Sequence, residues 1–135
     1  MTLWAIFIGL YVWAVLASLW AGLSIHRFLS KYATISDERA LGAFKSVARW
    51  NMILALVQIV VLLSGTLTGI LLMMRHGLIK GLAAVLVANG VVLGLGKHFK
   101  TLEDRARSLP AASDELAAEH RRVSETWVRK PLPDF

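Results

Sequence analysis

The sequence predicts an all-α integral membrane protein, with three transmembrane helices in an antiparallel bundle followed by an amphipathic, helical cytoplasmic tail. The 135 residues are 56% hydrophobic and have a mean hydropathy of +0.59, whereas soluble domains are about 45–50% apolar. The apolar residues also gather in three blocks that are almost free of charge. We therefore expect a membrane domain at 1–96, with spans at about 2–26, 50–74 and 78–96, and a tail at 97–135.

The first block, 2–26, carries no charge before His26. No positively charged segment precedes it, so it predicts a retained span and not a cleaved signal peptide. Small residues recur four apart along it and end at Gly22. At that spacing they form a flat stripe on which a second helix can pack closely.

A charged segment, 27–49, follows the first span. Ser36 before Asp37 and Glu38 is typical of a helix start, with a capping hydroxyl and acids in the first turn. Apolar residues then repeat at helical spacing. We expect an amphipathic turn or two that continues directly into the second span.

The second block runs from Asn51 to Met74 without a formal charge. As a helix it is about 36 Å long, enough to cross a hydrocarbon core about 30 Å thick. Gly65 and Gly69 form a G-x-x-x-G motif at its centre, which indicates a tightly packed helix interface. The partner helix is open: a neighbour, a second copy or another protein.

The third block, 78–96, begins after a short polar turn, so the second and third spans must form a hairpin. Lys80 lies close enough to its end to reach the interface. An unpaired amide in lipid is costly, so Asn89 should face protein, with Gln58 on the adjacent helix as one candidate partner. Small residues form two rows along this span, one through Gly81 and one through Gly90 and Gly94.

Two short amphipathic helices fit the tail, separated by Pro110, and Ser113 supplies the start signal of the second. Their apolar positions are Phe99, Leu102, Ala106 and Leu109 in the first, and Leu116, His120, Val123 and Trp127 in the second.

Positive charge sets the expected orientation. Of 15 Lys and Arg residues, five lie at 27–49, two at 75–80 and eight in the tail. With three spans, thirteen share one side, which the positive-inside rule assigns to the cytoplasm. The amino terminus is then outside, and the expected location is the bacterial inner membrane. The same cations suit lipid headgroups, so nucleic acid is not an expected partner.

The chemistry available to this chain is limited. Cysteine is absent, no carboxylate lies within a span, and no phosphate loop or nucleophile motif is present. The tail carboxylates alternate with Lys and Arg, as on a solvated, salt-bridged helix face. His26 and His98 end the first and third spans on the same side and are candidate axial ligands of a haem or chlorin, with Gly22 leaving room for a macrocycle. Otherwise they lie among headgroups or cap helix ends.

Four short stretches carry a resemblance to a known family: residues 20–23 (WAGL), 27–29 (RFL), 63–69 (LSGTLTG) and 78–82 (LIKGL). They resemble segments of the bacterial multi-pass membrane protoporphyrinogen oxidases and, more loosely, the copper-resistance-type small membrane proteins. The similarity covers about the first hundred residues and implies porphyrin oxidation with a haem ligand.

The chain also departs from this family. Trp13 stands near the place of the family's first-helix histidine, and a charged tail replaces the fourth helix. The resemblance therefore implies only Arg27 and Lys80 as polar site residues.

Three functional hypotheses remain open. The first, a non-catalytic accessory or assembly subunit of an inner-membrane complex, follows from small-residue faces on all three spans. Its partners would be lipid and other transmembrane subunits or further copies of the chain. The second is a haem- or chlorin-binding redox protein with His26 and His98. The third is a homo-oligomeric channel lined by Gln58, Thr66 and Asn89.

Overall fold

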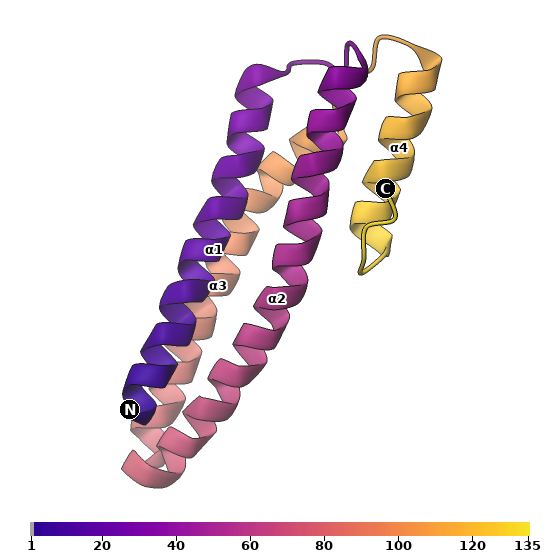
Figure 1. The fold of residues 1–135 in the computed structure, drawn as a ribbon. Helices are drawn as coiled ribbons and strands as arrows, with labels where there is room; N and C mark the ends of the chain where they lie inside the picture. The colour runs from indigo at the N-terminus through magenta and orange to yellow at the C-terminus, as the bar shows by residue number, and fades with distance from the viewer. Residues whose placement is uncertain (1) are drawn as a thin grey trace. The chain divides into compact units, whose positions relative to one another are not determined.

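The computed structural model describes residues 2–135 and is all-helical (Figure 1), as the sequence predicts. Its elements are α1 (Leu3–Lys31), α2 (Glu38–His76), α3 (Leu78–Arg107) and α4 (Asp114–Arg129). Within the described residues there is no strand, only an isolated parallel bridge between Ile35 and Ala111.

Three of the helices, α1, α2 and α3, are long and apolar enough to cross a membrane, in agreement with the three predicted spans. Each continues past its apolar block. The amphipathic segment before the second span is part of α2, which has 39 residues. The segment after Gly96 was expected to form a separate short helix, but it is the last part of α3. No proline or capping residue interrupts the chain there, so the helix continues to Arg107.

The chain folds into two compact units, and each unit contains parts of α1, α2 and α3. Unit 1 contains α1 up to Leu19 and the stretch Val57–His98, which is the end of α2 and most of α3. Unit 2 contains Trp20–Leu56 and Phe99–Phe135. It therefore holds the end of α1, the start of α2, the end of α3 and all of α4.

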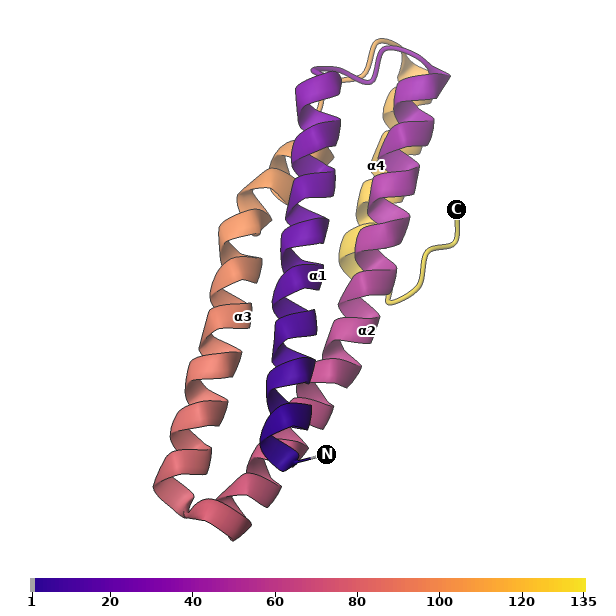
Figure 2. The same ribbon diagram turned by 60° about the vertical axis from the view of Figure 1, so that its left-hand side comes forward.

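Unit 1 is built on the predicted hairpin between α2 and α3, whose turn is visible in Figure 2. Gly77 has a φ of 103°, which favours glycine, and its N–H donates to the carbonyl of Met73 at 3.1 Å. Beyond the turn, α3 passes close to α2. A Cβ on Gly81 would lie 2.7 Å from the backbone nitrogen of Met73.

The core of unit 1 joins α1 to this hairpin. Leu72 is fully buried there, and the rings of Phe7 and Tyr11 lie 4.7 Å apart. The remaining buried members are Ala14, Val85 and Val92.

The core of unit 2 centres on Phe44 of α2, which is fully buried. Its ring centroid lies 5.9 Å from that of Phe28 on α1, 4.4 Å from that of His120 and 5.9 Å from that of Trp127, both on α4. Figures 1 and 2 both show α4 beside the first half of α2. The apolar face predicted for the second tail helix is therefore the face that α4 buries.

Two loops of unit 2 are joined by backbone hydrogen bonds. The N–H of Ile35 donates to the carbonyl of Pro110 at 2.8 Å, and the N–H of Ala112 donates to the carbonyl of Ile35 at 3.0 Å. Ile35 itself is fully buried in the core. The α1–α2 and α3–α4 connections are thereby held together at one end of the unit.

One of the two predicted helix starts is confirmed and the other is displaced. The hydroxyl of Ser113 caps α4 by accepting from the N–H of Leu116. At α2, Asp37 and not Ser36 is the cap, because its carboxylate accepts from the N–H of Ala40 at 2.8 Å. The charge of Asp37 also faces the positive end of the helix dipole, which a hydroxyl cannot match.

Candidate functional site

The two amides that the sequence places within the predicted spans are each hydrogen-bonded inside unit 1. Gln58 Nε2 donates to Ser18 Oγ at 2.8 Å and to the carbonyl of Ala14 at 3.2 Å. Asn89 Oδ1 accepts from the hydroxyl of Tyr11 at 3.1 Å. Gln58, the candidate partner for Asn89, is therefore not the group that Asn89 Oδ1 accepts from, because α1 supplies a partner to each amide.

The predicted packing glycines of unit 1 fall into two sets. Those of the first set lie against a neighbouring segment: a Cβ on Gly65 would come within 2.6 Å of the Tyr11 ring, Gly69 faces Val85, and Gly81 faces Met73. These glycines make the close helix approaches inside unit 1.

Gly90 and Gly94 make up the second set, which we call the open glycine row. A Cβ at either position would meet nothing within 4 Å. Both lie on α3, four residues apart, and so on one side of the helix. The described chain itself leaves this row uncovered.

Neither of the two candidate cofactor ligands is buried. His26 belongs to unit 2 and His98 to unit 1, and both are exposed. The ring of Phe99 occupies the space beside Gly22, so a macrocycle at that place would have to displace it. Residues 2–135 contain no group of three or more His, Cys, Asp or Glu that could hold a metal ion. The space beside Gly22 therefore does not fit a macrocycle.

The two residues that the family resemblance implies belong to different units. Arg27 lies in unit 2 and Lys80 in unit 1, and both side chains are exposed.

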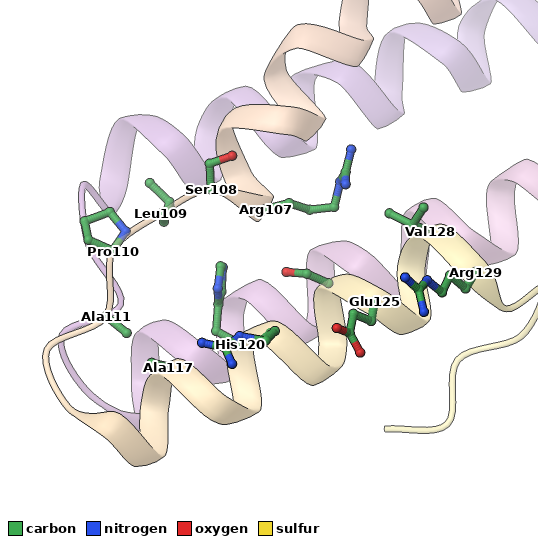
Figure 3. A pocket seen from close by; sticks show the side chains of 12 residues that line it. Arg107, Ser108, Leu109, Pro110, Ala111, Ala117, His120, Glu125, Val128 and Arg129 are labelled. Atoms are coloured by element: carbon green, nitrogen blue, oxygen red, sulfur yellow. The ribbon is translucent and has the colours of Figure 1, made fainter.

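A polar groove lies in unit 2 between the end of α3 and α4 (Figure 3). This α3–α4 groove has a volume of about 520 Å³, and its charged lining residues are Arg107, Arg121, Arg129 and Glu125. In Figure 3, His120 extends from α4 toward the end of α3. The groove was not predicted from the sequence. The available signal was the eight-residue spacing of Arg121 and Arg129, which places both on one side of a helix.

The electrostatics around α4 reflect its docking on α2. Hydrogen bonds from Arg122 and Lys45 lower the pKa of Glu119 to about 2, and the Lys45 Nζ to Glu119 Oε1 distance is 3.0 Å. Burial lowers the pKa of His120, although its ring nitrogen Nε2 donates to the carbonyl of Ala106 at 3.1 Å. Burial therefore favours the neutral form of His120, whose hydrogen bond joins α4 to the last turn of α3.

Comparison with known proteins gives no relative. No protein-family model, no curated protein and no solved structure matches this chain.

Proposed function

We propose that this chain is a non-catalytic accessory or assembly subunit of a larger inner-membrane complex, which it joins through its transmembrane helices. The observation that carries the proposal is the open glycine row on α3. The other predicted packing glycines of the spans are used inside the chain, whereas Gly90 and Gly94 have nothing within 4 Å of a Cβ. Glycine weakens an apolar helix, so an unused pair four residues apart is explained best by a partner helix.

The sparse burial of the spans supports the same proposal. Only 28% of the most apolar window of α1, and 17% of the corresponding windows of α2 and α3, is buried within the chain. The intramembrane amides Gln58 and Asn89 are already bonded inside unit 1, which makes them weak candidates for a channel lining. The exposed surface of the three apolar helices is therefore mostly apolar, which suits contact with lipid and with other helices.

The proposed orientation places the amino terminus outside and unit 2 in the cytoplasm. Three spans put the end of α1, the start of α2 and the end of α3 on one side, and these segments belong to unit 2. Of the 15 Lys and Arg residues, only Arg75 and Lys80 lie at the opposite end of the spans. Positive-inside then favours the bacterial inner membrane with the tail inside.

The test uses Gly90→Leu and Gly94→Leu in the full chain, purified in a mild detergent from its native membrane. We expect each to remove the co-purifying subunits while the monomer keeps its helical content, because nothing in the chain contacts these positions. Val60→Phe is the matched control, since it adds the same four carbons to a side chain of α2 that is 62% exposed.

Sizing of the unaltered protein decides the outcome. A wild-type chain that runs as a lone monomer, with no partner and no second copy, contradicts the proposal. A wild-type complex that survives both glycine substitutions shows that the open glycine row is not its interface.

A further inference from the structure

Within unit 2, α4 runs beside α2 in the same direction and in register. Ile35 and Ala111, which precede the two helices, form the parallel bridge, and the rings of Phe44 and His120 meet further along. His120 follows Ala111 by as many residues as Phe44 follows Ile35. Figures 1 and 2 both show that α2 and α4 start at the same end of the unit. Positions along α4 can therefore be matched to positions along α2.

The last turn of α4 is level with the first turn of the apolar block of α2. The two helices have the same rise per residue, so the register places Arg129 level with Ile53. Arg49 is the last charged residue before the block 51–74. It also contacts the segment that follows α4, because its Nε donates to the carbonyl of Phe135 at 3.1 Å. The end of α4 thus reaches the depth at which the predicted second span begins.

Large apolar side chains are exposed at this level. Val128, in the last turn of α4, is 57% exposed, and Leu132 is 63% exposed. Leu132 lies in a turn closed below the helix by the ion pair of Lys130 and Asp134, whose atoms are 2.8 Å apart. The facing turn of α2 also exposes a large apolar side chain, that of Trp50. We call Val128, Leu132 and Trp50 the apolar end of unit 2.

The charges around the apolar end are compatible with a membrane surface. Asp134 is the acid of the segment after α4, and it is paired with both Lys130 and Arg122. Arg129 is exposed and forms no ion pair within residues 2–135. Long basic side chains beside apolar ones extend toward headgroups. Exposed apolar side chains together with an unpaired cation are typical of helices that lie in the membrane interface.

We propose that the apolar end of unit 2 inserts into the headgroup region of the membrane that α2 enters, with Arg129 facing the phosphates of anionic lipids. The block 51–74 is about 36 Å long as a helix, which exceeds a hydrocarbon core of about 30 Å but not the 40–45 Å that includes the headgroups. Its first turn, and the end of α4 level with it, therefore lie among lipid headgroups. This inference rests on the membrane domain of the proposed function but not on a partner subunit.

Spin labels on single cysteines measure the contact. The chain has no cysteine, so Val128→Cys and Leu132→Cys in the full chain each carry one nitroxide. The chain is placed in vesicles of phosphatidylcholine and phosphatidylglycerol, and collisions with oxygen, which concentrates in lipid, are compared with collisions with a water-soluble nickel complex. We expect an oxygen-to-nickel ratio several-fold higher at both positions than for Ala118→Cys, an exposed position in the first half of α4.

A second pair of variants tests the role of the cation. Added to Leu132→Cys, Arg129→Gln should shift the label toward water in vesicles that contain phosphatidylglycerol, and it should have less effect in phosphatidylcholine alone. Arg121→Gln is the matched control, since it removes the same charge from an exposed position of α4 two turns further from the predicted span. It should leave the label where it is. An equal shift for both variants means that α4 is attracted through its overall charge, which contradicts a specific role of Arg129.

Leu63→Cys shows whether the chain is inserted, because Leu63 lies within the predicted second span and is 67% exposed. With the Leu63 label in lipid, a Leu132 label that is as open to nickel as the Ala118 label overturns the proposal. A Leu132 label shielded from both reagents also overturns it, because protein then covers the apolar end. A Leu63 label in water would contradict the membrane domain and both proposals. Absence of partner subunits contradicts the proposed function alone, since the vesicles contain only this chain.

Discussion

Replacing Phe44 by alanine should release α4 from unit 2. Phe44 is fully buried, and its ring contacts Phe28 of α1 as well as His120 and Trp127 of α4. Phe-to-Ala substitutions in cores cost about 3–5 kcal/mol. Because three rings lose their common neighbour, we take a value of about 4 kcal/mol, which corresponds to a roughly 10³-fold increase in local opening.

The loss should concentrate on α4 because this helix depends on docking. It has 16 residues, and isolated helices of that length are marginal in water. Its remaining contacts with α2 include the partly exposed ion pair of Lys45 and Glu119, which contributes about 0–1 kcal/mol. Such a pair cannot offset the lost core contacts.

Hydrogen exchange of the α4 amides in the detergent-solubilised chain measures the effect. We expect exchange in Phe44→Ala to approach that of an undocked helix, while the α2–α3 hairpin of unit 1 keeps its protection. Arg39→Ala, an exposed position on the same helix, should change stability by no more than about 0.5 kcal/mol. If α4 stayed as protected in Phe44→Ala as in the wild type, the assignment of Phe44 as the centre of this core would be refuted.

Three further substitutions test individual contacts. Gly81→Ala should destabilise the hairpin by about 1–3 kcal/mol, because the new Cβ meets backbone atoms of α2 that cannot move aside. Gly90→Ala, where the new Cβ meets nothing, should be neutral or slightly stabilising. Equal melting temperatures for the two variants would contradict this reasoning. Tyr11→Phe removes the hydroxyl that donates to Asn89, and it should lower the free energy of unfolding in bicelles by about 0.6–1.7 kcal/mol. Tyr32→Phe should lower it by less, because the hydroxyl of Tyr32 makes no hydrogen bond within residues 2–135. Burial lowers the pKa of His120 below its usual 6.5, so the unfolded chain binds more protons at this residue than the folded chain does. The docking of α4 should therefore weaken as the pH falls from 7 to 5. If a His120→Gln variant showed the same pH dependence, another group would be responsible.

The helices themselves could be predicted because lipid leaves few alternatives. A stretch such as 51–74, without a charge over its length, satisfies its backbone in lipid only as a helix. The same reasoning does not say how far a helix continues into water. The helix α3 passes Gly96 and ends at Arg107, because the polar residues after Gly96 favour helix as well and no proline intervenes.

The side-chain pairing could not be predicted to the same degree. Spacing along a helix shows which residues share a face, but it does not show which two faces meet. Asn89 and Gln58 both needed a partner, and each found one on α1, at Tyr11 and Ser18. Tyr11 carries no sequence signal that separates a buried donor from an interfacial aromatic residue.

The charge pattern of the tail shows the same limit and explains why the groove escaped sequence reasoning. Alternating acids and bases suggest that each cation has a partner, and this holds for Arg122, which contacts Glu119 and Asp134. Arg121, next to it in the sequence, points along a different side of α4, because consecutive helical residues are about 100° apart. His120 and Val123 are buried in the core, and Arg121 lines the groove between α4 and the end of α3, whereas Arg122 does not. Whether a cation of the tail finds a carboxylate partner therefore depends on which face of α4 is buried in the core. Only the folded unit determines which face that is.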